Sequence, residues 1–197
     1  MKRNFCSKCH YPINTCVCKY VSPSLHTQTK IVILQHPDEA NLAKNTARLL
    51  QLQLNNIQLY VGQKPEDFQQ ARELTGYKRC ALLYPGENAV TVQQMQQLPA
   101  LDILFVIDGT WKKAHKILAL NSWLLALQAV TFDAIPENQY RIRKAEQAHS
   151  LSTLESVSLF INQYEGVDHQ PLLALLKGMI TEQTKLMPAH VKARYNL

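Results

Sequence analysis

The sequence predicts an α/β protein with a mainly parallel sheet and flanking helices. Short apolar runs rich in β-branched residues recur along the chain, and helical patterns lie between them. Buried parallel strands have this continuous apolar character. Strands that alternate with helices are typical of the α/β class.

The apolar run at residues 103–107, Ile-Leu-Phe-Val-Ile, is the strongest strand signal in the chain. The first run is followed by Pro37 and the third by Pro85, because proline keeps the preceding residue out of regular helical structure. We therefore expect strands over residues 31–34, 57–61, 81–84, 103–107 and 129–132.

Helical patterns fill the intervals between the strands. Asp38 is the expected N-cap of a helix that continues through Leu54, with Leu42, Leu49 and Leu50 on its apolar face. Further helices are expected over residues 93–98, 111–120, 152–164 and 170–186, with a polar connection over residues 134–150.

The composition is that of a soluble globular protein, with 197 residues, 46% of them apolar and 18% charged. No apolar run approaches the ~20 residues that a membrane-spanning helix needs. The start also lacks the apolar stretch of a signal peptide, so we expect a cytoplasmic protein with no membrane partner. The net charge of +6, with no Asp or Glu in residues 1–37, favours an anionic partner such as nucleic acid, although solvated lysines explain it equally well.

Four cysteines form two close pairs in a short polar segment: Cys6, Cys9, Cys16 and Cys18. Four thiolates suit a tetrahedral Zn²⁺ ion and leave it no open position, so the zinc would be structural. An iron–sulfur cluster could use the same sulfurs, whereas reduced cytosolic thiols do not favour disulfides. We therefore divide the chain into a zinc-binding knuckle, residues 1–30, and an α/β catalytic domain, residues 31–197. The fifth cysteine, Cys80, is expected to be a small buried apolar residue.

Polar residues follow three of the predicted strands, at the edge where ligands gather in α/β folds. These segments are His36-Pro37-Asp38-Glu39, Tyr84-Pro85-Gly86 and Asp108-Gly109-Thr110-Trp111. Asp108 is either the cap of the following helix or a carboxylate directed into the cleft. Trp111 is either a core residue or a surface on which a base stacks, and Trp123 is expected in the core.

Further along the chain, Ser152 and Glu155 have the spacing of a capping box, and helix starts also bind anions. The chain thus carries six short motifs in order, which are C-x2-C-x6-C-x-C, His36-Pro37-x-Glu39 with Asn45-Thr46, Tyr84-Pro85-Gly86, Asp108-Gly109-Thr110-Trp111, the pair Arg141 and Arg143, and Leu151-Ser152-Thr153-x-Glu155. With these motifs the chain resembles the DTW-domain family, the tRNA-uridine aminocarboxypropyltransferases, from Cys6 to about Ile161. A glycine splits the Asp-Thr-Trp sequence that names the family.

The resemblance implies a fold related to the knotted SPOUT methyltransferases. It also implies that the 3-amino-3-carboxypropyl group of S-adenosylmethionine moves to N3 of a uridine in tRNA, leaving 5′-methylthioadenosine. Asp108 is the expected catalytic residue, as the base that helps N3 to attack. The residues expected to bind S-adenosylmethionine are Tyr84, Pro85, Gly86, Ile107, Thr110, Trp111, Ser152, Thr153 and Glu155. The residues expected to contact the RNA are His36, Lys112, Lys113, Arg141 and Arg143.

Two other functions stay open on the sequence alone. An RNA methyltransferase would use the same donor, turned slightly so that its methyl group faces the acceptor. A non-catalytic zinc-dependent RNA-binding module would need no donor, but the polar residues at several strand ends argue against it. His36 fits a structural turn before proline as well as a substrate contact. The sequence predicts neither which uridine is modified nor whether the protein is a monomer or a homodimer.

Overall fold

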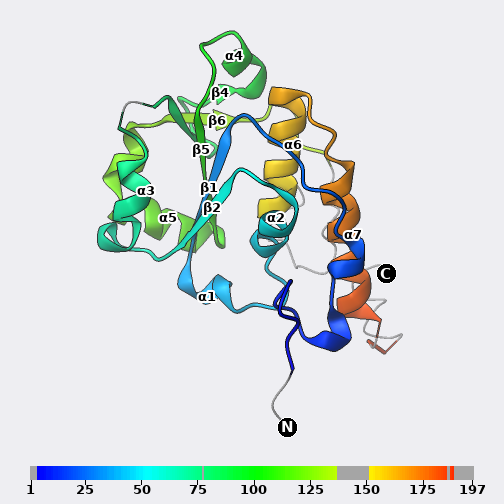
Figure 1. The fold of residues 1–197 in the computed structure, drawn as a ribbon. Coiled ribbons are helices and arrows are strands. Elements are labelled where there is room, and N and C mark those ends of the chain that lie inside the picture. Colours follow the sequence, from blue (N-terminus) through cyan, green and yellow to red (C-terminus); the bar gives the residue numbers. More distant parts are fainter. Residues whose placement is uncertain (1–3, 77, 137–150, 186, 189–197) are drawn as a thin grey trace.

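Parallel strands form a single six-stranded sheet in the computed structural model, which describes residues 4–76, 78–136, 151–185 and 187–188 (Figure 1). The order across the sheet is β2-β1-β5-β3-β6-β4, and every neighbouring pair is parallel. The strands are β1 (Lys30–Gln35), β2 (Ile57–Val61), β3 (Cys80–Leu83), β4 (Val90–Thr91), β5 (Ile103–Asp108) and β6 (Gln128–Thr131).

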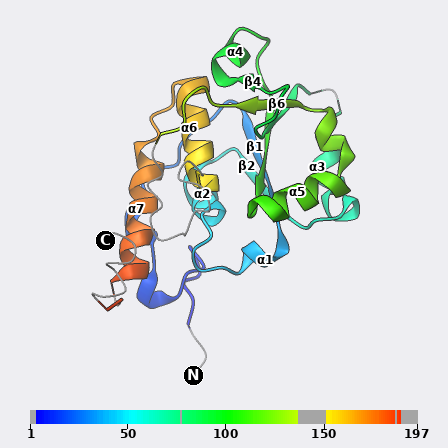
Figure 2. The ribbon, with the colours of Figure 1, turned by 180° about the vertical axis from the view of Figure 1, so that it is seen from behind.

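Helices cover both faces of the sheet (Figures 1 and 2). One face carries α2 (Ala47–Gln53), α6 (Thr153–Glu165) and α7 (Gln170–Thr184). The other carries α3 (Gln69–Glu73) and α5 (Trp111–Leu120). The remaining short elements are α1 (Pro37–Ala40), α4 (Val92–Gln96), and the 3-10 turns η1 (Ile13–Thr15), η2 (Cys18–Tyr20), η3 (Pro65–Phe68) and η4 (Ser122–Ala126). Among the described residues, no helix combines the length and the apolar character needed to cross a membrane.

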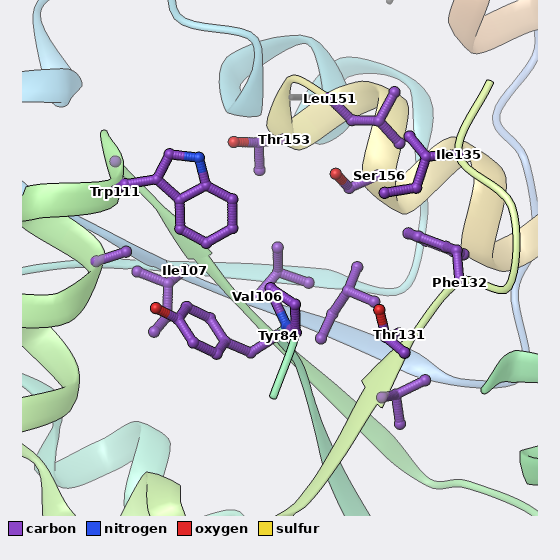
Figure 3. A pocket seen from close by; sticks show the side chains of 15 residues that line it. Tyr84, Val106, Ile107, Trp111, Thr131, Phe132, Ile135, Leu151, Thr153 and Ser156 are labelled. Atoms are coloured by element: carbon purple, nitrogen blue, oxygen red, sulfur yellow. The ribbon is translucent and has the colours of Figure 1, made fainter. Parts of the chain in front are cut away.

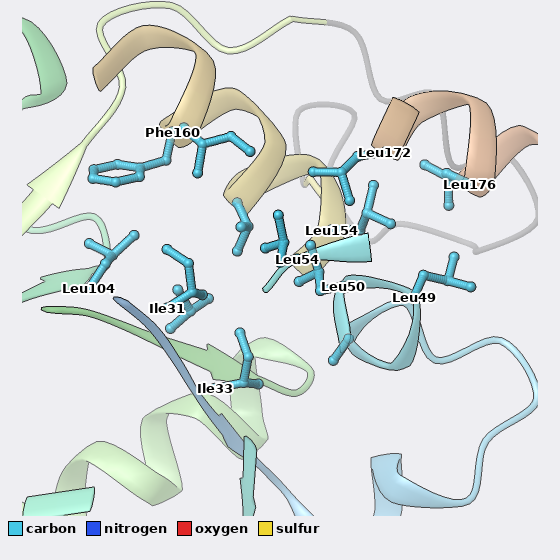
Figure 4. Close-up of a cluster of buried hydrophobic side chains, with 14 of the residues drawn as sticks. Ile31, Ile33, Leu49, Leu50, Leu54, Leu104, Leu154, Phe160, Leu172 and Leu176 are labelled. Carbon is cyan, nitrogen blue, oxygen red and sulfur yellow. The ribbon is translucent and has the colours of Figure 1, made fainter. Parts of the chain in front are cut away.

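The two faces bury two separate apolar clusters, because successive side chains of a strand point to opposite sides. On β1, Ile31 and Ile33 pack beneath α2, α6 and α7, whereas Val32 and Leu34 face α3 and α5. Figure 4 shows the first cluster, in which Ile31 and Ile33 lie among leucines from the three helices. Burial on both faces is why the central strands read as unbroken apolar runs.

The strand order places β5 between β1 and β3, and this creates a switch point in the sheet. The chain leaves β1 toward α2 on one face, and it leaves β5 toward α5 on the other (Figure 1). Where neighbouring strands send the chain to opposite faces, their carboxyl ends border a crevice suited to ligands. Gln35 and Asp108 are in register at that point.

The cysteine-containing segment packs against the face that carries α2 and α7. Cys9, Tyr11 and Val17 are fully buried in the same cluster as the helix leucines. Tyr20 lies against Gly178 of α7 so closely that a methyl group on the glycine would overlap the tyrosine ring. Glycine at this position therefore permits the close approach of the segment to α7.

The buried carboxylate of Glu182, one turn further along α7, adds polar contacts to this docking. It accepts hydrogen bonds from the Tyr20 hydroxyl at 3.1 Å and from the Lys19 ammonium at 2.8 Å. Lys185 completes the group at 2.5 Å. The hydrogen bonds from Lys185 and Lys19 lower the pKa of Glu182 to about 2.

The predicted strands are confirmed to within one or two residues at each end, and the helix over residues 111–120 is confirmed as α5. The continuous helix from Asp38 through Leu54 was wrong. The chain forms α1 and α2 instead, with a turn between them that exposes 47% of Leu42. The side chain of His36, not Asp38, caps α1 by accepting from the Asp38 amide.

Three shorter elements were not predicted: η3, α3 and β4. The predicted helix over residues 170–186 ends earlier, at Thr184. Trp123 packs edge-on against Phe105 at 5.4 Å between ring centroids, as a partly buried member of the second cluster. Cys80 is half-buried at the start of β3, rather than enclosed. Of the predicted polar connection, residues 137–150 lie outside the described part of the chain.

Candidate active site and metal centre

A cavity of about 330 Å³ opens at the carboxyl ends of β3, β5 and β6. Figure 3 shows side chains from these strand ends and from the start of α6 converging on it. The walls are mostly apolar, and Thr131, Thr153 and Ser156 bring hydroxyl groups to them. The lining residues are Leu83, Tyr84, Pro85, Val106, Ile107, Gly109, Trp111, Ala114, Val130, Thr131, Phe132, Ile135, Leu151, Thr153 and Ser156.

Aromatic rings form one wall of the cavity. Tyr84 meets Trp111 edge-on at 5.8 Å between ring centroids and His115 at 6.0 Å. Trp111 is 38% exposed, so it is a wall of the cavity and not a core residue. Its ring face can therefore take a flat ligand, because bases stack on such surfaces.

Asp108 ends β5 beside the cavity and is only 5% exposed. Its Oδ2 accepts hydrogen bonds from Gln35 Nε2 at 2.8 Å and from Asn45 Nδ2 at 2.7 Å. Its Oδ1 accepts from the Thr153 hydroxyl at 2.5 Å. Three donors on two oxygens are the partners that an ionised carboxylate requires when it is buried.

Asp108 does not cap the helix that follows it. The N-cap of α5 is Thr110, whose hydroxyl oxygen accepts from the Lys113 amide at 3.4 Å. Asp108 also stands behind the cavity wall, since its neighbours Ile107 and Gly109 line the cavity and Asp108 itself does not. Its carboxylate reaches the cavity through Thr153.

Thr153 stands between Asp108 and the cavity. A hydroxyl group has one proton to donate and two lone pairs to accept with. Because the proton of Thr153 is directed to Asp108, the lone pairs of its oxygen remain for a molecule in the cavity. The pair therefore presents an acceptor that is backed by a buried negative charge.

The four cysteine sulfurs converge in the N-terminal segment, where all of the Sγ atoms lie within 4.8 Å of one another. Cys6 and Cys18 are 3.7 Å apart, and Cys9 and Cys16 are 3.6 Å apart. A Zn–S distance of about 2.3 Å gives a tetrahedral S–S edge of about 3.8 Å. The four sulfurs therefore fit one tetrahedral metal ion.

Backbone amides also prepare the sulfur of Cys6 to bind a metal. Hydrogen bonds from the Cys9 and Lys8 amides lower the pKa of the Cys6 thiol to about 6. The thiolate is the form that coordinates metal ions. Two backbone hydrogen bonds, from the Cys6 amide to the Tyr11 carbonyl and from the His10 amide to the Cys6 carbonyl, close the loop around the first pair at 2.8 and 2.9 Å.

Comparison with known proteins shows where this arrangement belongs. The family model described as the DTW domain matches residues 3–184, which is nearly the whole chain. The chain belongs to the DTW-domain family. No solved structure matches it.

Curated relatives of this DTW-domain protein come from animals and plants. It is 30% identical over 202 residues to tRNA-uridine aminocarboxypropyltransferase 2 of Drosophila melanogaster, with all of this chain and 76% of the relative covered. It is 28% identical to the Macaca fascicularis protein of the same name, over 92% of this chain and 64% of the relative. With tRNA-uridine aminocarboxypropyltransferase A of Arabidopsis thaliana it shares 25% identity, over 94% of this chain and 83% of the relative.

The residues that name the DTW family have separate tasks in the structure. Asp108 accepts the three hydrogen bonds behind the cavity, Thr110 caps α5, and Trp111 forms the cavity wall. The inserted Gly109 lines the cavity, where a side chain would crowd Lys113 Cβ at 3.1 Å. The glycine therefore keeps this part of the wall open.

Several residues that the sequence assigns to the donor site lie elsewhere. Ser152 and Glu155 form the predicted capping box of α6: the amide and hydroxyl of Ser152 donate to Glu155 Oε2 at 2.8 and 2.6 Å. Both are buried and neither lines the cavity, and Gly86 is exposed outside it. Tyr84 and Pro85 do line it, as do the predicted Ile107, Trp111 and Thr153.

The residues assigned to RNA contacts also separate. His36 is buried in a turn, where Nδ1 accepts from the Asp38 amide and Nε2 meets Gln63 Oε1, both at 3.2 Å. Lys113 Nζ lies 2.7 Å from Glu39 Oε1, and this hydrogen bond raises the pKa of Lys113. Lys112 is exposed on α5. Arg141 and Arg143 lie outside the described residues.

Two residues of the site were missed on the sequence alone. Gln35 donates to Asp108, and its position directly across from Asp108 in the β1–β5 register could have been found only from the strand order. Asn45 belongs to a recognised motif, but nothing in the sequence shows that its amide reaches the end of β5. The cavity residues after β6, Phe132 and Ile135, follow a predicted strand end that carried no polar signal.

Proposed function

We propose that this DTW-domain protein transfers the 3-amino-3-carboxypropyl group of S-adenosylmethionine to N3 of a uridine in tRNA. One observation carries the proposal: the Thr153–Asp108 pair presents a charged acceptor to a largely apolar cavity. Family membership and the names of the relatives support it. The chain spans 76% of the Drosophila relative and 64% of the macaque one, so the reaction is inferred here from the residues it does contain.

The donor fits the cavity by its chemistry. Tyr84, Pro85 and Ile107 offer apolar surface, and Trp111 a ring face, to the nucleoside part of S-adenosylmethionine. The predicted donor residues outside the wall, Gly86, Thr110, Ser152 and Glu155, would act indirectly by shaping the turns that hold these walls.

Thr153 and Asp108 supply the proton acceptor for the transfer. The Thr153 oxygen accepts the hydrogen bond from uridine N3–H, and N3 attacks the carbon next to the sulfonium of the donor. The N–C bond forms while the C–S bond breaks, and its electron pair leaves on sulfur as 5′-methylthioadenosine. The N3 proton passes to the Thr153 oxygen as the Thr153 proton passes to Asp108, so both residues have direct roles in the transfer.

We also propose that the metal is zinc and that its role is structural. The fit to a single tetrahedral ion supports this, because an iron–sulfur cluster binds its cysteines through several iron atoms and spreads them further apart. Four sulfurs fill the coordination sphere, so the ion would hold the segment together without activating water. The insertion of β5 between β1 and β3 supports a relation to the knotted SPOUT fold.

Contacts to the tRNA are proposed for exposed cations beside the cavity mouth. Lys112 follows Trp111 directly on α5, and both are exposed. Phosphate contacts position a nucleic acid without reading its bases. A lysine at this place would hold the tRNA backbone while a uridine enters the cavity, and Arg141 and Arg143 are proposed to assist it.

The proposal is tested by incubating unmodified tRNA transcripts with the metal-loaded protein and S-adenosylmethionine. Mass spectrometry of the digested nucleosides should find an aminocarboxypropyl adduct on uridine, with 5′-methylthioadenosine released and both products lost in Asp108→Ala. A methyl adduct with S-adenosylhomocysteine would instead establish an RNA methyltransferase. No adduct on any tRNA from folded, metal-loaded protein would favour the RNA-binding module.

A further inference from the structure

A continuous series of hydrogen bonds joins the cysteine segment to Asp108. The hydroxyl of Tyr11, which is fully buried, donates to the backbone carbonyl of Asn45 at 3.1 Å. The side-chain amide of Asn45 then donates to Asp108 Oδ2 at 2.7 Å. Asp108 in turn accepts from Thr153 in the cavity wall. Each of these contacts is buried or partly buried, where hydrogen bonds are held more firmly than in water.

Tyr11 is fixed by the loop that carries the cysteines. It lies between Cys9 and Cys16 in the sequence, and its carbonyl accepts from the Cys6 amide at 2.8 Å. The guanidinium of Arg48 lies over its ring, 5.1 Å from the centroid. A metal ion on the four sulfurs would therefore fix the backbone on both sides of Tyr11.

Asn45 depends on such contacts because it lies in the turn between α1 and α2, outside regular structure. Tyr11 holds its carbonyl, and the Arg48 amide donates to its Oδ1 at 3.2 Å. With those two groups occupied, the remaining amide hydrogens of the side chain are directed at Asp108. The turn has a defined position because its contacts define it.

We propose that Tyr11 is a positioning residue for the transfer reaction, through which the four-cysteine site sets the position of Asn45 and hence of Asp108. The proposal rests on the proposed function. It assigns the cysteine segment a part in catalysis, beyond holding the fold together or gripping RNA. A displacement of the acceptor by a fraction of an ångström lowers the rate of transfer without changing how the donor binds.

The segment offers its own control, because a second tyrosine fastens it to the body of the protein. The Tyr20 hydroxyl donates to Glu182 of α7 at 3.1 Å, and none of the described contacts links that pair to Asp108. Tyr11→Phe and Tyr20→Phe each remove one hydroxyl from the same segment. They differ in whether the lost contact leads to the cavity.

The experiment compares the two variants with the wild type as full-length, zinc-loaded protein. Zinc content and thermal midpoint are measured first, and then kcat and KM for S-adenosylmethionine. Tyr11→Phe should lower kcat about 10-fold with KM unchanged, whereas Tyr20→Phe should keep kcat within about twofold. The NMR signals of the Asn45 side-chain amide should shift in Tyr11→Phe and stay in place in Tyr20→Phe.

Unchanged kcat and unchanged Asn45 signals in Tyr11→Phe would overturn the proposal. Equal losses of kcat in both variants, in proportion to their losses of stability, would also overturn it, since the segment would then contribute only stability. If the wild type forms no adduct on tRNA, the proposed function fails, but the Asn45 signals still decide whether Tyr11 positions this residue.

Discussion

The hydroxyl of Thr153 lies 2.5 Å from Asp108 Oδ1, although the two residues are 45 positions apart in the sequence. Asp108 ends the central strand β5, and Thr153 is the first residue of α6. The contact thus fastens the start of a helix to the carboxyl end of the sheet at the wall of the cavity. It makes Thr153 the group through which the buried carboxylate meets a ligand.

Thr153→Val should abolish most of the transfer activity. Valine keeps the shape of the side chain but removes the oxygen that we propose as acceptor, so kcat should fall by about 100-fold or more. Thr153→Ser, which keeps the hydroxyl, should retain most of the activity. Single-turnover assays with saturating donor measure both. Ser156→Ala is the matched control, because Ser156 lines the same cavity and its activity loss should be small; equal losses at both positions would contradict the assignment.

Cys9→Ser should release the metal and destabilise the protein. Cys9 is fully buried at the centre of the cluster of four sulfurs. Binding free energies of structural zinc are about 10–16 kcal/mol in small zinc domains, so weakening the site removes a large share of the energy that orders the segment. Elemental analysis should find one zinc per wild-type chain and a loss in the variant, with a lower thermal midpoint. Cys80→Ser, at the start of β3, should keep the zinc.

Gly178→Ala should destabilise the fold, although alanine is usually the better residue in a helix by about 0.5–1 kcal/mol. A methyl group at this position would overlap the Tyr20 ring and push the cysteine segment off α7. Overpacking of this kind costs about 1–3 kcal/mol in the free energy of unfolding. Chemical denaturation measures the change, and Gly76→Ala, where the added methyl meets only ordinary contacts, should show none of it. A Gly178→Ala variant that is as stable as the wild type would show that the tyrosine is not held there.

Stability should fall in acid through Glu182. The pKa of this carboxyl is about 2 in the folded protein against an ordinary value of 4.5, because Lys185 and Lys19 stabilise its charge. Folding therefore favours the ionised form: the stabilisation is complete above pH 4.5 and is lost as the pH falls from there through about 2.

Glu182→Gln isolates this contribution, because other acid-sensitive groups, including the zinc site, remain in both proteins. The difference in unfolding free energy between wild type and variant should be largest above pH 4.5 and should shrink toward pH 2. A difference that does not change with pH would exclude the ion pairs as its source.

Lys112 and Lys113 should respond differently to removal of their charge. Lys112→Ala should weaken tRNA binding about equally for all sequences and lower the salt dependence of the affinity by about one charge, as expected for a phosphate contact. Lys113→Ala should act mainly on stability, because it leaves the buried Glu39 without its partner at 2.7 Å. Binding titrations at several salt concentrations and thermal melts separate the two. Identical salt dependence in Lys112→Ala and wild type would place the tRNA elsewhere.

The strands were predictable because their burial on both faces leaves a local signal, an unbroken apolar run. The helix expected from Asp38 through Leu54 failed because its pattern was judged by apolar spacing alone. That pattern ignored contacts made across the fold: Asn45 turns toward Asp108, and the chain must leave helical geometry to let it do so. Tertiary contacts of this kind override local preference.

For the site, the position of Asp108 followed from its place after the strongest strand. Its partners did not, because Gln35 becomes a neighbour only once β5 is inserted beside β1, and strand order is not written in local sequence. The capping box at Ser152 was predictable from spacing, and it explains why Glu155 turns inward on the helix and away from the cavity. Trp111 was open between core and surface on the sequence, and its 38% exposure decides for the surface.

The docking of the cysteine segment on α7 joins parts of the chain that are made at different times. A ribosome releases residues 4–20 long before residues 170–184, so Tyr20 emerges without the helix that later receives it. The four sulfurs lie within residues 6–18 and need no other part of the chain to surround an ion. The nascent protein can therefore capture its zinc first, and the loaded segment then closes over the sheet as the last step of assembly.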